Sequence, residues 1–221
     1  MPRQPLFAGD PALVVVDIQR GAVLPADLVG IDHMEGAAER IGNAELLVAA
    51  ARAAGVPLIF FQEVHRRSGV DLGRELDGAE GVHCVEGEQA TELWPTLVPG
   101  ADEIHIVKRR YSGFIGTDFD IVLRGLGVST LVLIGGLTDV CVHYTFADAH
   151  QRDYHVRAVA DCVGGSSLAR HLAALDAMEY LQAGACRSTA EILDAFAVLA
   201  ANRAAQVTGP VGVARPQPVG R

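Results

Sequence analysis

Short runs of apolar residues alternate along this chain with segments long enough to form helices. Continuous apolar strands separated by helices are typical of a parallel sheet covered on both faces, because both faces of each strand must then be buried. Half of the 221 residues are hydrophobic, which is enough for a large core. The alternation therefore predicts a single α/β domain with three layers, in which helices flank a mostly parallel sheet.

The expected elements follow from apolar runs, helical periodicity and glycine or proline stops. Strands are predicted at 12–17, 57–62, 103–108, 130–135 and 155–160, and helices at 34–54, 117–126, 139–152, 166–183 and 191–204. The domain is expected to span 1–204. The tail at 205–221 holds prolines and glycines without periodicity, so it is expected to be flexible or to pack on another subunit.

Charge and composition exclude several classes of partner. The formal net charge is -9, and an acidic surface repels phosphate backbones and anionic lipids, so neither nucleic acid nor membrane is expected as a partner. The first residues lack the apolar core of a signal peptide, and no apolar run approaches the roughly 20 residues of a membrane helix. A cytoplasmic location is expected. The cysteines are widely spaced without a CxxC pair, which favours reduced thiols.

Polar side chains stand at the ends of three predicted strands. Asp17 ends the first strand, Lys108 ends the third, and Cys141 follows the fourth. In an open parallel sheet, ligands bind beyond the carboxyl ends of the strands. Taken singly, Asp17 could be a turn residue and Lys108 a surface lysine, but together they mark one edge of the sheet as the candidate site.

Cys141 lies just after a strand that runs into Gly135 and Gly136. The chain turns there, and a helix is expected to begin near Asp139. The unpaired amides and the dipole at the start of a helix stabilise a thiolate, so we expect a lowered pKa for Cys141. The alternative is a small buried apolar cysteine, but the strand, glycine and helix turn favours a nucleophile.

The segments VVVDIQ at 14–19, VKRRYSGF at 107–114 and GGLTDVCV at 135–142 carry a family resemblance. With them, the chain resembles the isochorismatase-like cysteine hydrolase superfamily, which includes nicotinamidases, N-carbamoylsarcosine amidases and biuret or ureidoacrylate hydrolases. The resemblance extends over about 10–200. It implies a six-stranded, mostly parallel sheet, no cofactor, a small amide or ureide substrate, and a homodimer or homotetramer.

The resemblance also implies a catalytic triad of Asp17, Lys108 and Cys141. The thiolate would attack an amide carbonyl, Asp17 would accept and return the proton, and Lys108 would hold Asp17 ionised. The oxyanion would be bound by the backbone amides of Leu137 and Cys141, next to a cis peptide bond between Gly136 and Leu137. A thioester would form, and ammonia would be released.

Several residues are candidates for substrate contacts. Tyr111, Phe114 and the long segment 64–100 are expected to form the pocket walls. Gln182 either contacts the substrate, as a matching glutamine does in ureide hydrolases of the superfamily, or is an exposed residue at a helix end. Trp94 is either a packing anchor or interface residue or a pocket wall.

Arg66, Arg74 and Arg109 could each bind a substrate carboxylate, and the sequence does not choose among them. Solvated surface arginine is the default for each.

No metal site is expected. Nicotinamidases carry a metal-binding Asp-x-His after the second strand, whereas Glu63 and His65 stand here in a different pattern, so His65 is expected to be a loop or pocket residue. A couple between His83 and Cys84 is also not expected, because adjacent residues on an extended segment point to opposite faces.

Two other functions remain open at this point. One is hydrolysis of another bond by an isochorismatase-type enzyme, although isochorismatases do not use a cysteine at this position. The other is a catalytically silent binding protein on the same fold.

Overall fold

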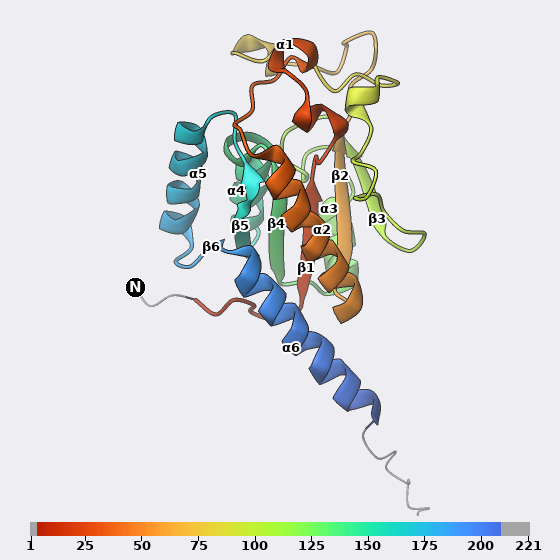
Figure 1. Ribbon diagram of the computed structural model, residues 1–221, viewed down its shortest axis with the longest axis vertical. Coiled ribbons are helices and arrows are strands. Elements are labelled where there is room, and N and C mark those ends of the chain that lie inside the picture. The colour runs from red at the N-terminus through yellow and green to blue at the C-terminus, as the bar shows by residue number, and fades with distance from the viewer. Residues whose placement is uncertain (1–3, 209–221) are drawn as a thin grey trace, which may run out of the picture.

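The computed structural model describes residues 4–208, with side chains for residues 4–205. Its centre is a six-stranded sheet in the order β3-β2-β1-β4-β5-β6, and every pair of neighbouring strands is parallel (Figure 1). The strands are β1 Pro11–Val16, β2 Leu58–Glu63, β3 Ile104–Lys108, β4 Thr130–Gly136, β5 His155–Gly164 and β6 Cys186–Arg187. The sheet is thus wholly parallel, where a mostly parallel one was expected.

Helices cover both faces of this sheet, which gives the expected three layers. Helices α2 and α6 pack against each other over one face, whereas α3, α4 and α5 lie on the opposite side (Figure 1). The helices are α1 Ala26–Val29, α2 Ala37–Ala54, α3 Phe119–Leu126, α4 His143–His150, α5 Leu168–Leu181 and α6 Thr189–Thr208. Gly55 ends α2 in the left-handed conformation, with a φ of 63°, as its glycine stop predicts.

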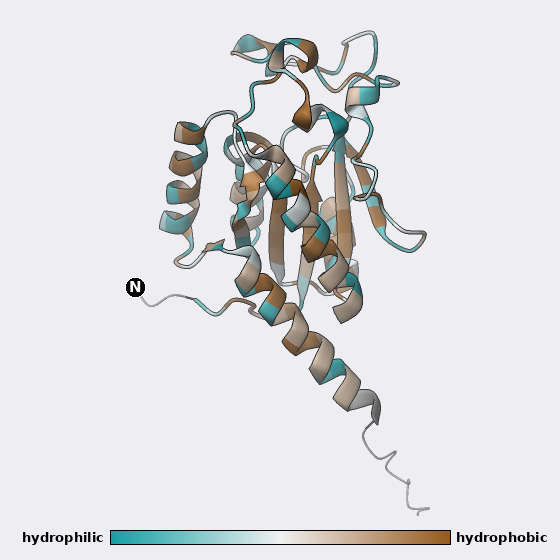
Figure 2. Ribbon diagram, in the orientation of Figure 1, coloured by the Kyte–Doolittle hydropathy of each residue, from teal (hydrophilic) through white to brown (hydrophobic). Residues whose placement is uncertain are grey.

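Two hydrophobic clusters, one on each face of the sheet, form the core. Alternate residues of β1 divide between them: Val14 and Val16 face α3 to α5, while Leu13 and Val15 face α2 and α6. All of β1 is buried, and the central strands carry the hydrophobic colours of Figure 2. Burial on both faces explains why these strands read as continuous apolar runs rather than alternating ones.

The strand order reverses between β1 and β4. From β1 the chain proceeds outward to β2 and β3, then returns to β4 on the other side of β1. A crevice forms where strands leave in opposite directions, and ligands bind there in open α/β sheets. The topology therefore predicts a ligand site at the carboxyl ends of β1 and β4.

Some predicted boundaries were wrong. The short strand β6 was missed, because a two-residue strand gives no apolar run. Helix α6 runs from Thr189 to Thr208, whereas the predicted helix spans 191–204. The remainder of the predicted tail, 209–221, lies outside the described residues. Within the described part of the chain, no helix is both long and apolar enough to cross a membrane.

Candidate active site

The three residues at the strand ends meet in space. Asp17 directly follows β1, Lys108 is the last residue of β3, and Cys141 lies in a π-helical turn, Thr138–Val142, between β4 and α4. The Nζ atom of Lys108 lies 2.8 Å from Asp17 Oδ2 and 3.3 Å from Cys141 Sγ. The parallel sheet brings the three together because all of its strands end at the same edge.

Glu63 is a fourth member of this group that the sequence analysis did not place there. It is the last residue of β2 and the register partner of Lys108 on β3. Its Oε2 atom accepts a hydrogen bond from Lys108 Nζ at 2.9 Å and another from the Cys141 thiol at 3.3 Å. The side chain is buried. The strand-end argument that selected Asp17 also applies to Glu63, once β2 is extended by one residue.

The neighbouring groups, rather than burial, separate the pKa values of the two carboxyl groups. Desolvation raises the pKa of Asp17 to about 6, although the Lys108 ammonium opposes the shift. Desolvation also acts to raise the pKa of Glu63, but the ammonium of Lys108 and the hydrogen bond from His65 outweigh it, so the pKa of Glu63 lies below its usual range. Asp17 is therefore the more basic of the two, and Glu63 is a fixed anion.

Lys108 is completely buried and keeps its charge. Burial acts to lower its pKa, but the neighbouring Asp17, Cys141 and Glu63 raise it well above the usual value. Removing one partner of such a buried ion pair costs about 3–5 kcal/mol, because the remaining charge is left uncompensated.

The expected lowering of the Cys141 pKa was wrong for the resting site. The residue is 5% exposed, and burial followed by the charge of Glu63 raises its pKa well above the usual value, more than Lys108 lowers it. Desolvation and a neighbouring anion both disfavour the thiolate. The resting nucleophile is thus a neutral thiol that needs a base.

The turn before Cys141 supplies backbone amides beside the thiol. The Gly136–Leu137 peptide bond is cis, and Leu137 immediately precedes the π-helical turn that holds Cys141. The Leu137 carbonyl accepts hydrogen bonds from the amides of Val140 and Val142, which fixes the turn. Leu137 and Cys141 both line the same pocket, so their amides remain the proposed oxyanion donors.

This turn requires glycine at Gly135. Its φ is +109°, and a Cβ there would lie 2.0 Å from the carbonyl oxygen of Val16. Any other residue would force β4 away from β1 and separate the turn from Asp17.

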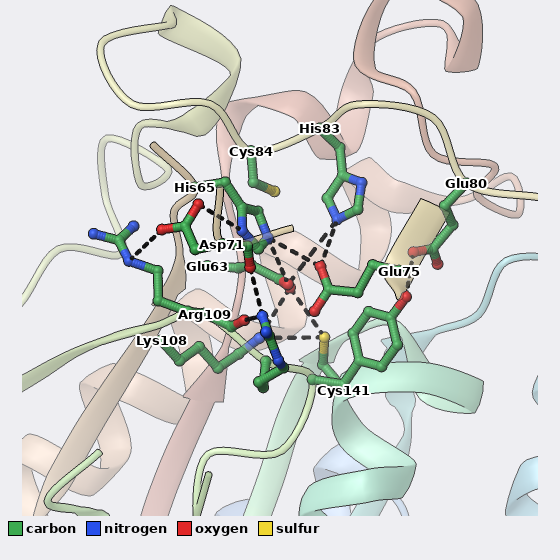
Figure 3. Close-up of polar contacts among 12 residues, drawn as sticks. Glu63, His65, Asp71, Glu75, Glu80, His83, Cys84, Lys108, Arg109 and Cys141 are labelled. Carbon is green, nitrogen blue, oxygen red and sulfur yellow. Dashed lines mark hydrogen bonds and ion pairs between the residues drawn. The ribbon is translucent and has the colours of Figure 1, made fainter. Parts of the chain in front are cut away.

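A second buried cluster adjoins the first through Glu63. His65 Nε2 lies 3.3 Å from Glu63 Oε1 and 3.0 Å from Glu75 Oε2, and His83 Nε2 lies 3.6 Å from the same Glu75 oxygen. Figure 3 shows Glu63 between these histidines and the pair of Lys108 and Cys141. His65 was expected to be a loop or pocket residue, and His83 was given no role; both are buried parts of this cluster.

This cluster has the donor set of a transition-metal site. The ligand atoms of Glu63, His65, Glu75 and His83 lie within 4.8 Å of one another, and all four residues are buried. The Oε1 atom of Glu75 is buried and makes no hydrogen bond within the described residues, whereas Oε2 pairs with both histidines. Two imidazoles and two carboxylates suit Zn²⁺, Mn²⁺ or Fe²⁺. These residue types therefore fit a divalent metal ion, although none was expected from the sequence.

A pocket opens over Cys141 and Asp17, with a cavity volume of about 160 Å³. Its floor is the edge of the sheet, and its walls come from the segment after β1 and from the long segment 64–100. Tyr111 lines it, as expected, and donates a hydrogen bond to Glu80 Oε2 at 2.7 Å. The volume suits a small molecule rather than a polymer.

Two of the predicted substrate contacts were wrong. Phe114 is buried in the core, where its ring packs 4.7 Å from that of Phe119, and it does not line the pocket. Gln182 is neither exposed nor near the pocket: its side chain binds the backbone of Val156 and Tyr154. Trp94 packs against the core cluster beneath α2 and α6 and does not line the pocket, which favours a packing anchor over a pocket wall.

The three candidate arginines are already paired. Arg66 and Arg109 both contact Asp71, and Arg74 contacts Asp77. None of the three lines the pocket over Cys141.

Gln182→Ala should destabilise the protein without impairing catalysis. The buried amide side chain satisfies backbone groups, so its loss should cost about 1–3 kcal/mol of unfolding free energy. Urea denaturation measures this cost, with the exposed Gln151→Ala as the control, which should change stability by less than about 0.5 kcal/mol. A fall in kcat/KM at unchanged stability would instead return Gln182 to the substrate site.

Glu63→Gln should make Cys141 more reactive toward alkylation. Since the negative charge of Glu63 raises the pKa of Cys141, its removal should lower that pKa and increase the thiolate fraction at a given pH. The measurement is the rate of iodoacetamide labelling of the Cys141 peptide at neutral pH. Glu88→Gln, which changes another carboxyl group of the pocket lining, should leave the rate unchanged. Slower labelling in Glu63→Gln would contradict this electrostatic assignment.

Comparisons with known proteins agree with the fold. The model of the isochorismatase domain matches residues 11–191. The ureidoacrylate amidohydrolase RutB of Pseudomonas syringae pv. syringae is 35% identical, and the match covers 69% of this chain and 70% of the relative. A cysteine hydrolase from Pseudomonas syringae pv. phaseolicola superposes with a TM-score of 0.78 at 28% identity, covering 89% of this chain and 97% of that one.

A third relative acts on a different compound. The N-carbamoylsarcosine amidase of Thermoplasma acidophilum superposes with a TM-score of 0.67 at 26% identity, covering 81% of this chain and 96% of that one. Since the family model spans most of the sequence and the sheet and helices match those of solved members, this chain belongs to the isochorismatase family of hydrolases.

Proposed function

We propose that this protein hydrolyses a C–N bond of a small amide or ureide, with Cys141 as the nucleophile, and releases ammonia. The observation that carries the proposal is the buried ammonium of Lys108, which contacts Asp17, Glu63 and the Cys141 thiol at the floor of one pocket. A nucleophile, a base and a fixed cation in reach of one another are what thiol-dependent acyl transfer requires.

Asp17 is the group that takes the thiol proton. Its carboxylate lies within 4.8 Å of Cys141 Sγ, and its pKa near 6 makes it a stronger base than Glu63 while leaving it ionised at neutral pH. Lys108 stabilises the thiolate as it forms. Glu63 holds Lys108 in place and stays charged throughout.

The reaction then follows ordinary acyl transfer. The thiolate attacks the carbonyl carbon, and the amides of Leu137 and Cys141 stabilise the oxyanion. Asp17 returns the proton to the leaving nitrogen, so ammonia departs and a thioester forms. Water, deprotonated by Asp17, hydrolyses the thioester and frees the thiol. A fixed cation and preorganised amides suit the negative charge that develops on the oxyanion.

A metal ion would be held by Glu63, His65, Glu75 and His83. It would supply Lewis-acid polarisation of a substrate heteroatom at the pocket wall. The protonation steps above use only the chain's own residues and stand without it.

Two alternatives are weaker. An isochorismatase-type hydrolase of another bond would release no ammonia. A catalytically silent binding protein does not require a lysine buried between two carboxyl groups beside a thiol. Such an arrangement costs desolvation free energy and contributes little stability compared with apolar residues. The relatives named for ureidoacrylate and N-carbamoylsarcosine support amides and ureides as the substrate class. The expected homodimer or homotetramer stays a prediction.

Cys141→Ala and Cys141→Ser should abolish turnover, on the order of 10⁴-fold or more, and Asp17→Asn should come close to the same loss. The experiment is an ammonia-release screen over nicotinamide, carbamoyl amino acids, biuret, ureidoacrylate and simple aliphatic amides, with Cys141→Ala as the blank. Cys186→Ala, a cysteine outside the pocket lining, is the matched control and should keep activity. Full activity in Cys141→Ala would refute the nucleophile.

The pH dependence of kcat/KM should show an acid limb near pH 6. Asp17 must be ionised to accept the thiol proton, and its pKa is raised to about 6, so activity should rise as the pH rises through this value. Steady-state rates across the acid and neutral range measure it. In Asp17→Asn, the residual rate should lack this limb; a limb that persists there would assign the base to another group.

A further inference from the structure

The pocket over Cys141 is apolar over most of its wall. Beyond the reacting group, its lining includes Leu28, Val29, Ile31, Val82 and Val140. These side chains can hold a short hydrocarbon segment but offer it no hydrogen bond. A substrate that fills the pocket therefore needs few polar groups along its middle.

Arg40 is the one lysine or arginine in the lining of this pocket, whose acidic residues are Asp17, Glu63, Glu80 and Glu88. It lies near the start of α2, on the face of the sheet opposite α4, so it reaches the strand ends from the side away from the helix that follows Cys141. Its Nη1 atom donates to the carbonyl of Glu35 at 2.7 Å, and Nη2 donates to that of Met34 at 3.0 Å. These bonds fix the plane of the guanidinium.

Gly164 makes room for this guanidinium beside the reacting centre. A Cβ at Gly164 would lie 2.4 Å from Arg40 Nε and 2.8 Å from Cζ. Gly164 is the register partner of Gly136, the residue before Leu137. Neighbouring strands lie about 4.8 Å apart, so the guanidinium sits roughly one strand beyond the turn that carries the proposed oxyanion amides.

Arg40 has no carboxylate partner among residues 4–205, whose side chains the structure describes. Arg66, Arg74 and Arg109 differ in this respect, because each contacts an aspartate. A guanidinium has five N–H donors, and neutral carbonyls accept from two of its nitrogens here. A half-buried cation held in a rigid position, without an anion, is suited to bind one that arrives with the substrate.

We propose that Arg40 binds a carboxylate of the substrate, so that the enzyme acts on ureido acids or on half-amides of dicarboxylic acids with a short apolar linker. This inference rests on the proposed function for the bond that is cleaved. The amide carbonyl lies at Cys141, the linker crosses the apolar wall, and the carboxylate pairs with Arg40 on the far side.

Binding to the inactive Cys141→Ser variant tests this without turnover. The probes are succinamate and 3-ureidopropionate, each compared with its methyl ester by isothermal titration calorimetry. The acids should bind on the order of 10- to 100-fold more tightly than the esters, as expected for a charged hydrogen-bonded pair. Adding Arg40→Met should remove this preference and leave the affinity of the esters unchanged. Arg74→Met, which removes an exposed arginine already paired with Asp77, is the matched control and should keep the preference.

Three results would overturn the proposal. The first is equal affinity for acid and ester, and the second is failure of both acids to bind. The third is an Arg40→Met variant that binds acids and esters more weakly to the same extent, which would mean that Arg40 only holds the backbone at 34–35. Arg40→Lys keeps the charge and should retain part of the preference, which covers the case in which Arg40→Met does not fold. If the acids bind as expected but the wild-type enzyme releases no ammonia from them, the proposed function fails, while the assignment of Arg40 as the carboxylate-binding residue stands.

Discussion

The ammonium of Lys108, buried between two carboxyl groups, is the interaction on which the rest of the site depends. It lies 2.8 Å from Asp17 and 2.9 Å from Glu63 at the end of β3. Two carboxylates this close cannot both stay ionised in a buried site unless a cation compensates them. The parallel sheet brings all three groups to one edge, so the charge balance of the site depends on the register of the strands. A shift in the register of β3 would leave two buried acids without a cation.

The same constraint sets the chemistry. Because Glu63 is the register partner of Lys108 and also receives a hydrogen bond from His65, it holds its charge, whereas Asp17 depends on Lys108 alone for strong compensation and its pKa rises. The two carboxyl groups that share the Lys108 ammonium therefore have pKa values shifted in opposite directions. The thiol, next to a fixed anion, stays protonated until a substrate arrives. This arrangement protects Cys141 from reaction with other electrophiles while leaving a base within reach of it.

Much of this could be predicted from the sequence, because strand-end residues follow directly from apolar runs. Asp17, Lys108 and Cys141 were found in this way, and the three-layer fold follows from the alternation of strands and helices. Glu63 was not assigned to the site because the second strand was ended one residue too early. Glu75 and His83 could not be placed, since they come from a long segment without periodicity, whose path depends on tertiary contacts. Phe114 and Gln182 were misassigned because a position in a motif does not reveal which way a side chain points.

Arg40 also could not be recognised as a site residue from the sequence. In the sequence it is one arginine of a predicted helix, and nothing marks it as a binding residue more than Arg66 or Arg74. Its position becomes informative only when β5 ends in Gly164 against its guanidinium.

The long segment 64–100 builds the site as well as covering it. Glu63 uses one carboxylate oxygen toward Lys108 and Cys141 and the other toward His65. The carboxylates of Glu63 and Glu75 favour the protonated form of His65 and His83. The pKa values of both histidines are therefore raised, although burial opposes this. The charge that holds Lys108 is therefore shared with a cluster formed by the loop. Changes in the loop that separated Glu75 from these histidines would reach Cys141 through Glu63, without altering any residue that touches the thiol.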